Sequence, residues 1–205
     1  AYLTYSVNVL MYKPLKKEID DFIYFVDSYE ISSQFIQFIS VLGEIQQNLS
    51  NEYIPIYTDY IYNINFNLLN TNKSKDEKKE LFRNNSVNII WVDSPISSFE
   101  KITSLFNSFN SSIQYSLIIV YPETDTHYHI KVRFSHENQK KFHFVEAAFI
   151  NDYIININSK SGIQYFINNL IALCEWDRLN CNSIWNINET IENNFIHRMN
   201  LIKGL

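Results

Sequence analysis

Glycine is scarce in this chain: 205 residues contain only Gly43, Gly162 and Gly204. Phosphate-binding loops, dinucleotide-binding turns and nucleophile elbows need clustered glycines, because their backbone adopts positive φ angles or comes close to a ligand. No two of these glycines lie within the length of such a motif. The sequence therefore excludes P-loop, dinucleotide-binding and serine-hydrolase sites.

Cysteine, basic charge and long apolar runs are also in short supply. Cys174 and Cys181 are too few for a disulfide framework or a structural zinc site. The 17 Lys and Arg residues against 22 Asp and Glu give a net charge of −5, so no overall basic field attracts nucleic acid or an anionic membrane. No apolar run approaches the roughly 20 residues that span a bilayer, and the first residues lack the order of a signal peptide. We therefore expect a soluble, intracellular protein with no membrane partner, in which any DNA contact is local or shared.

Hydrophobic periodicity predicts an α/β fold. Alternation or short apolar runs predict strands at residues 3–11, 53–69 (one or two strands), 87–92, 115–121, 128–134 and 153–157. Helical spacing of apolar residues predicts helices at 14–26, 32–47 with a kink at Gly43, 94–109, 140–150 and, most clearly, 163–174. This order is typical of βαβ units. We expect a mixed, largely parallel sheet flanked by helices, with buried strands at 115–121 and 153–157 and an antiparallel edge strand at 128–134.

The same patterns divide the chain into an α/β domain at residues 1–176 and a small helical segment at 177–205. Apolar residues of that segment form an approximately helical stripe: Trp185, Ile191, Phe195, Met199 and Ile202. About 30 residues cannot bury both faces alone. The stripe therefore docks either onto the chain's own core or onto a partner, and the residues leave both possibilities open.

No complete catalytic or metal site is apparent. His127 and His129 lie two residues apart on a predicted strand with Asp125 nearby, but there is no HExxH or CxxC motif, and we favour ordinary surface histidines. Asp93 and Glu123 follow buried strands, where parallel sheets place ligands, yet two lone carboxylates are a weak basis for catalysis. We predict no metal, no cofactor, no catalytic residue and no small-molecule substrate.

Four basic residues could form a local phosphate-binding strip. Lys131 and Arg133 are expected on the outward face of the strand at 128–134, and Lys140 and Lys141 follow closely. Phosphate contacts need only a few such groups. The alternative is that these are solvated surface charges.

Three stretches resemble the nuclease-like domain of the XPF family of structure-specific endonuclease subunits: SVNIIWVDSPISSFEKITSLFNSF, QYSLIIVYPETD and FINDYIININSKSGIQYFINNLIALCEW. The closing WNINETIENNFIHRMNLIKGL resembles the opening half of the helix-hairpin-helix module that follows that domain. The similarity spans about residues 86–205 and is weaker before them. It implies an XPF-like α/β domain with a helix-hairpin-helix-like tail, which is incomplete if the module extends beyond Leu205.

The chain departs from the family at the active motif. The acidic, Arg and Lys positions of that motif fall on Trp91, Val92 and Asp93, so the metal-binding carboxylate and its basic neighbours are missing and two-metal cleavage has no ligand set. The likeness is therefore to a pseudonuclease, similar to the meiotic "shortage in chiasmata" crossover factors. It implies a non-catalytic nuclear and chromosomal subunit that heterodimerises with an ERCC-type partner and binds branched DNA to promote crossovers.

On this interpretation, Lys131, Arg133, Lys140, Lys141, Arg198 and Lys203 are candidate DNA contacts, and the stripe from Trp185 to Ile202 is a candidate partner interface. Two alternatives stand beside it. One is an α/β scaffold subunit that does not bind DNA, which the acidic charge favours. The other is an active nuclease using Asp93 and Glu123, which we do not expect.

Overall fold

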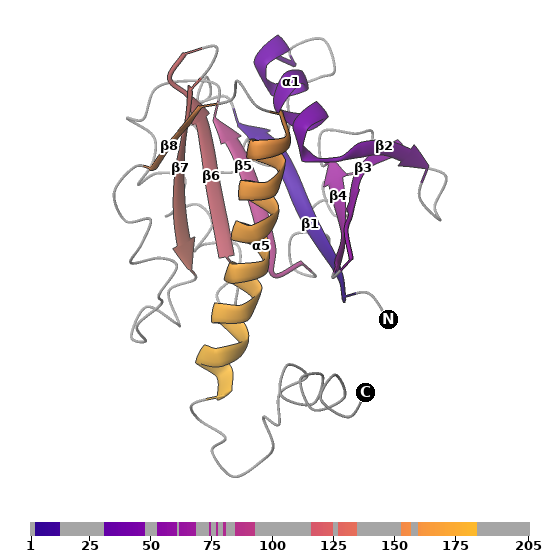
Figure 1. Ribbon diagram of the computed structural model, residues 1–205, viewed down its shortest axis with the longest axis vertical. Helices are drawn as coiled ribbons and strands as arrows, with labels where there is room; N and C mark the ends of the chain where they lie inside the picture. Colours follow the sequence, from indigo (N-terminus) through magenta and orange to yellow (C-terminus); the bar gives the residue numbers. More distant parts are fainter. Residues whose placement is uncertain are drawn as a thin grey trace.

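The computed structural model describes residues 3–12, 31–47, 53–60, 62–68, 74, 77, 80, 85–92, 116–124, 127–134, 153–156 and 160–183. Its strands are β1 (Leu3–Tyr12), β2 (Glu44–Gln47), β3 (Tyr53–Thr58), β4 (Tyr62–Leu68), β5 (Val87–Val92), β6 (Ser116–Pro122), β7 (His127–Phe134) and β8 (Tyr153–Asn156). Two helices within these ranges, α1 (Ser33–Leu42) and α5 (Lys160–Ser183), accompany them. The strands form one sheet in the order β2-β3-β4-β1-β5-β6-β7-β8 (Figure 1).

The sheet is mixed, as expected, but it is not largely parallel. Strands β4, β1, β5 and β6 pair in parallel. The remaining pairs, β2–β3, β3–β4, β6–β7 and β7–β8, are antiparallel. Short connections join β2 to β3, β3 to β4 and β6 to β7, and a short connection permits only antiparallel pairing. A parallel centre therefore carries an antiparallel extension on each side.

Every predicted strand lies close to its expected position, but the assignment of one edge is wrong. β7 pairs antiparallel with β6, as predicted, yet it is not the edge strand, because β8 pairs along its other side. β8 is therefore an edge strand rather than the buried strand expected at 153–157, and the side chain of Ile154 is 49% exposed. An apolar run alone does not distinguish a central strand from an edge strand.

The helix expected at 32–47 is also shorter than predicted. Ser32 caps α1, its Oγ accepting a hydrogen bond from the Phe35 N–H at 3.2 Å. α1 ends at Leu42, and Glu44–Gln47 forms β2 instead of the last helical turn. Gly43 lies between them with an extended backbone, and a Cβ atom there would lie 2.6 Å from the backbone carbonyl of Ile56. The glycine permits this close approach of β3, so it marks the helix end rather than a kink.

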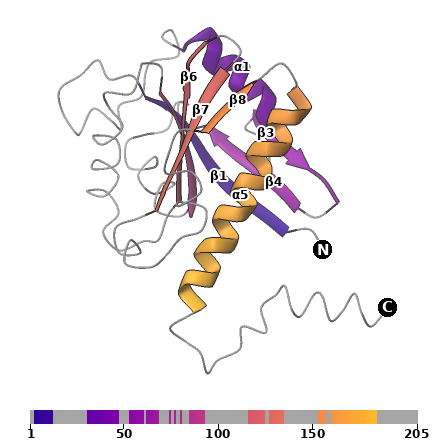
Figure 2. The same ribbon diagram turned by 60° about the vertical axis from the view of Figure 1, so that its left-hand side comes forward.

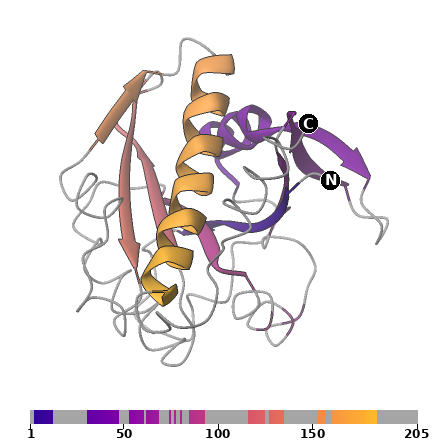
Figure 3. The same ribbon diagram turned by 60° about the horizontal axis from the view of Figure 1, so that its bottom comes forward.

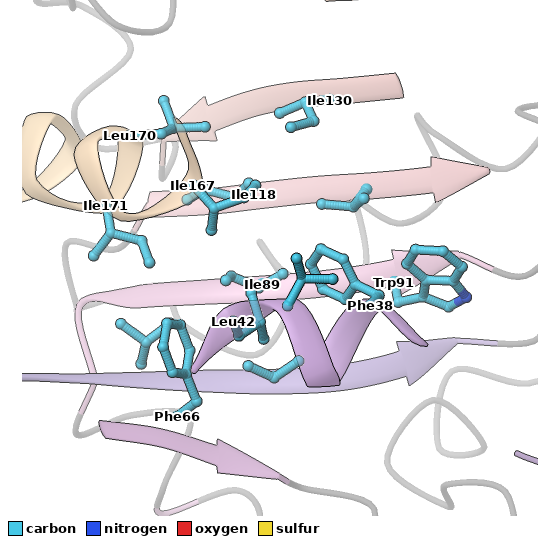
Figure 4. Close-up of a cluster of buried hydrophobic side chains, with 14 of the residues drawn as sticks. Phe38, Leu42, Phe66, Ile89, Trp91, Ile118, Ile130, Ile167, Leu170 and Ile171 are labelled. Atoms are coloured by element: carbon cyan, nitrogen blue, oxygen red, sulfur yellow. The ribbon is translucent and has the colours of Figure 1, made fainter. Parts of the chain in front are cut away.

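α1 and α5 pack on the same face of the sheet (Figures 2 and 3). The predicted stripe of α5, including Ile163, Ile167, Leu170, Ile171 and Cys174, is buried there. It meets alternate residues of the strands, such as Ile89 and Ile118, and the α1 side chains Phe38 and Leu42 (Figure 4). All six residues of β5 and the first six of β6 are buried, which is typical of the parallel centre of an α/β sheet.

α5 continues to Ser183 and so runs across the position between 176 and 177 where the helical tail was expected to begin. The helices predicted at 14–26, 94–109 and 140–150, and the tail from residue 184 onwards, lie outside the described residues. Neither described helix is long and apolar enough to cross a membrane.

Candidate nucleic-acid interface

Two positions of the degenerate nuclease motif belong to the hydrophobic core. Trp91 is fully buried near the end of β5 (Figure 4), and Val92 follows it with 3% exposure. The Trp91 ring stacks on Phe38 at 5.1 Å between centroids and meets Tyr128 edge-on at 5.1 Å. Neither side chain offers a metal ligand or reaches solvent. Asp93, the third position, lies outside the described residues.

The candidate phosphate ligands Lys131 and Arg133 lie on β7, on the face turned away from α1 and α5. Tyr128, Ile130 and Val132 of the same strand are buried in the core beneath those helices. Because side chains alternate along a strand, His129, Lys131 and Arg133 share the opposite face. The structure thus brings the two cations to one face, as predicted.

These two cations are half-buried rather than fully solvated. Burial lowers the pKa of Lys131, and the neighbouring positive charge of Arg133 lowers it further. Arg133 Nη1 donates a hydrogen bond to the carbonyl oxygen of Val132 at 2.9 Å. Repulsion between like charges on one face favours an anion beside them. Lys140, Lys141, Arg198 and Lys203 lie outside the described residues, so their place relative to this pair stays a prediction.

The turn between β6 and β7 is held by polar contacts. The backbone N–H groups of Glu123 and Thr124 donate to the carbonyl oxygen of His127 at 2.8 and 3.3 Å. Thr124 Oγ1 lies 3.2 Å from His127 Nδ1, and His129 Nε2 lies 3.2 Å from Glu123 Oε2. The two histidines and Glu123 therefore already interact with side chains of their own hairpin.

Tyr121 packs beneath this turn. Its ring stacks on His129 with 4.6 Å between centroids and 14° between planes. Burial, and secondarily the nearby Glu123 carboxylate, raise the pKa of Tyr121 to about 12. Within the described part of the chain, no group of three or more His, Cys, Asp and Glu side chains is arranged to hold a metal ion. Asp125 is outside that part.

The structure also reveals a buried asparagine cluster that sequence analysis did not single out. Asn8 and Asn88 face each other in register on β1 and β5, and both are fully buried. Asn8 Nδ2 donates to Asn88 Oδ1 at 2.8 Å, Asn85 Nδ2 donates to Asn8 Oδ1 at 2.6 Å, and Asn88 Nδ2 donates to the Asn85 carbonyl at 3.3 Å. The available signal was one Asn within the apolar run at 87–92 and one among the polar positions of the alternating strand at 3–11. The cluster ties β1 to β5 and is enclosed, so its role is structural.

A second buried polar contact was also missed. Glu175, which is 7% exposed on α5, accepts a hydrogen bond from the Ser86 hydroxyl just before β5. It joins the helix to the start of the central strand. The expected interface residues Trp185, Ile191, Phe195, Met199 and Ile202 lie outside the described residues, so neither alternative for that stripe is decided.

Comparison with known proteins places the fold and nothing finer. No protein-family model matches the chain, and no curated protein matches it. Among solved structures it is similar to the TSC2 GAP domain, with a TM-score of 0.57 and 16% sequence identity over 83% of this chain and 96% of that one. At that identity the likeness shows a shared α/β fold alone.

Proposed function

We propose that this chain is a non-catalytic, XPF-like subunit that heterodimerises with an ERCC-type partner and binds branched DNA. In this role it promotes meiotic crossover formation in the nucleus, on chromosomes. It acts by holding a recombination intermediate rather than by cleaving it. The helix-hairpin-helix character of the tail belongs to the same proposal.

The observation that carries the non-catalytic part is the burial of Trp91 and Val92. A two-metal nuclease needs carboxylates and cations that face the scissile phosphate. Here Trp91 fills the core between α1 and the sheet, and Val92, which points to the opposite face because side chains alternate along a strand, is buried as well. Restoring a charge at either position would bury it among apolar side chains, at a cost of several kcal/mol.

Lys131 and Arg133 support the DNA-binding part. Two cations on one face of β7 provide a local positive strip in a chain of net charge −5. Such a strip contacts few phosphates, so we expect the partner subunit to supply much of the electrostatic attraction. This division of labour accounts for an acidic DNA-binding subunit.

The test is a mobility-shift series with the chain alone and with a co-expressed ERCC-type subunit, on a four-way junction, a forked duplex and linear duplex, with and without Mg²⁺. We expect preference for the branched DNAs and no cleavage. The double variant K131Q/R133Q should weaken junction binding and lower the slope of log K against log salt by about 0.9 for each phosphate that it no longer neutralises. Lys160→Gln, which removes an exposed lysine of α5, is the control.

Equal affinity for branched and linear DNA would remove the junction-binding role. Absence of DNA binding by either form would leave the α/β scaffold subunit as the better account. Mg²⁺-dependent cleavage that Asp93→Ala abolishes would instead establish an active nuclease.

A second candidate function follows from the fold likeness to the TSC2 GAP domain, which extends over nearly all of that domain. A GAP domain contacts a GTPase and speeds GTP hydrolysis, and this chain would then bind a GTPase as its protein partner. Single-turnover hydrolysis by a panel of GTP-loaded Ras-superfamily GTPases, with and without the chain, tests this. Faster hydrolysis or a stable complex, together with no preference for branched DNA, would favour this candidate over the first.

A further inference from the structure

Strand β2 forms one edge of the sheet, and its outer side is free within the described part of the chain. There β2 pairs only with β3, and all four residues from Glu44 to Gln47 are exposed. Figure 1 shows β2 at the outermost position of the β2-β3-β4 side of the sheet. An exposed strand edge presents unpaired N–H and C=O groups that can pair with another chain.

Pro55 determines which backbone groups of β2 point outward. Ile45 faces Pro55 in the antiparallel register, and proline has no N–H, so this pair cannot exchange two hydrogen bonds. Bonded and non-bonded pairs alternate along an antiparallel ladder, so the bonded pairs are Glu44–Ile56 and Gln46–Ile54. The N–H and C=O groups of Ile45 and Gln47 therefore face the free edge.

Exposed apolar side chains lie beside those groups. Ile45 is 55% exposed, and Tyr53, which pairs with Gln47, is 69% exposed. Tyr57 packs against the core on the face that carries α1 and α5. Tyr53 lies four residues before it on β3 and therefore points to the same face. Ile45 and Gln47 of β2 share that face, because they pair with Pro55 and Tyr53. Glu44 and Gln46 lie on the other face. An added strand would thus meet the apolar Ile45 and Tyr53 together with the polar Gln47 on one face, and the acidic and polar pair Glu44 and Gln46 on the other.

The part of the chain that contains β2 carries acidic residues and no basic ones. Residues 18–72 contain eight Asp and Glu residues and no Lys, Arg or His, and two of these acidic residues, Glu44 and Asp59, lie in the described part of the chain. This stretch forms α1, β2, β3 and β4, and Glu44 belongs to the edge strand β2 itself. At the far side of the sheet order, β7 carries Lys131 and Arg133. Such an acidic region attracts cationic segments and repels acidic ones.

We propose that the β2 edge binds an extended, basic segment of a partner protein by strand addition. Backbone groups of that segment pair with those of Ile45 and Gln47. Its apolar side chains cover Ile45 and Tyr53, and its Lys or Arg side chains lie near Glu44 on the opposite face. This site is separate from the β7 cations and does not depend on DNA binding.

The test measures fluorescence anisotropy of a labelled octapeptide of alternating valine and lysine with the full chain. We expect saturable binding that weakens with salt, and little binding of the corresponding valine–glutamate peptide. Gln47→Pro removes one outward N–H and should weaken binding about tenfold, whereas Gln47→Ala keeps that N–H and should stay within about twofold of wild type. Glu44→Gln should weaken binding less and reduce its salt dependence.

Folding controls keep these results interpretable. Gln47→Pro should leave the thermal unfolding midpoint nearly unchanged, because proline is tolerated where an edge N–H faces outward. Gln46→Pro should lower that midpoint, because its N–H bonds to β3 in this register. A peptide N-methylated at alternate residues lacks the N–H groups that pair with β2, so it should bind wild-type protein weakly. Ile45→Ser should reduce binding, and Ile154→Ser, on the opposite edge strand and similarly exposed, should not.

Absence of peptide binding, or equal binding by wild type and Gln47→Pro with stable folding, would overturn the proposal. Equal affinity for the acidic peptide would also overturn it. If analytical ultracentrifugation shows a wild-type dimer that Gln47→Pro converts to monomer, and the basic peptide does not compete, a second copy of the chain occupies the edge and the proposed partner is wrong.

Discussion

At the scale of single residues, Gly43 shows how one missing side chain sets the boundary between a helix and a strand. A Cβ at this position would lie 2.6 Å from backbone atoms of Ile56, and this overlap can be relieved only if the backbone at Gly43 or at β3 moves. Gly43→Ala should therefore lower the free energy of unfolding by about 1–3 kcal/mol, measured by urea denaturation. Gly162→Ala, at an exposed position of α5, should have the opposite sign, with a gain of about 0.5–1 kcal/mol. Equal effects at the two glycines would contradict the close approach.

Asn8 is the centre of the buried asparagine cluster. Asn8→Ala removes the acceptor of Asn85 and the donor to Asn88, and each buried group left without its bond costs about 1–3 kcal/mol. Chemical denaturation should show this loss, and a double-mutant cycle with Asn88→Ala should give a coupling of at least about 0.5 kcal/mol. Asn67→Ala removes an exposed bond to Ser6 and should change stability by less than about 0.5 kcal/mol. An equal cost at Asn67 would argue against enclosure of the cluster.

Tyr121 provides a pH-dependent prediction. Its pKa is raised from the ordinary 10.0 of a tyrosine to about 12 in the folded protein, so between these values the folded state holds a proton that the unfolded state has released. Its contribution to stability is present below pH 10 and is lost as pH rises toward 12. Unfolding measured across this range should show a weaker alkaline decline for Tyr121→Phe. Tyr60→Phe, at a fully exposed side chain, controls for loss of a phenol.

Tyr121→Phe also tests packing at neutral pH. The Tyr121 hydroxyl is buried without a hydrogen-bond partner among the described residues. Removing an unsatisfied polar atom is neutral or stabilising, so the variant should be at least as stable as wild type. A clear loss of stability would indicate a bond from the hydroxyl to another part of the chain.

At the scale of elements, α5 holds the sheet through one buried stripe. Ile167 is fully buried and Leu173 is 43% exposed on the same helix. Ile167→Ala should lower the free energy of unfolding by about 2–5 kcal/mol, because it leaves a cavity against the sheet. Leu173→Ala should cost about 1 kcal/mol or less. Similar costs in denaturant unfolding would mean that the helix faces the sheet differently.

The contact between α1 and α5 illustrates why element ends are harder to foresee than element centres. Gln164 Nε2 donates to the carbonyl oxygen of Leu42, the last residue of α1, at 3.4 Å. One carbonyl at the end of α1 is thus satisfied by a residue far along the chain. No local pattern contains this information, whereas the stripe from Ile163 to Cys174 is entirely local and was predicted correctly.

At the scale of the whole molecule, the protection of backbone amides from hydrogen exchange should fall from the centre of the sheet to its edges. β1, β5 and β6 have pairing strands on both sides, and β5 and β6 are buried on both faces. Native-state hydrogen exchange should be slowest for their amides and fastest for the outward N–H groups of β2 and β8. Addition of the valine–lysine peptide should slow exchange at β2 alone. Slow exchange at β2 in the unliganded protein would contradict a free edge.

The candidate interface was predictable only in part. Alternation placed Lys131 and Arg133 on the face opposite Ile130 and Val132, and the structure agrees. That β7 lies inside the sheet depended on β8, whose pairing partner is not encoded in its own short apolar run. The DNA and ERCC-type partner remain predictions from the XPF resemblance.

The sequence by itself determined the local structure: period-two alternation or short apolar runs specified the strands, helical spacing specified the buried face of α5, and the scarcity of glycine excluded phosphate-binding loops. The tertiary structure decided which strands became edges and which polar residues were buried. Asn8 and Asn88 bond across 80 residues of sequence, and Ser86 and Glu175 across 89. Such contacts depend on how strands and helices assemble, because the cost or gain of burying a polar group is set by the partner that assembly brings to it.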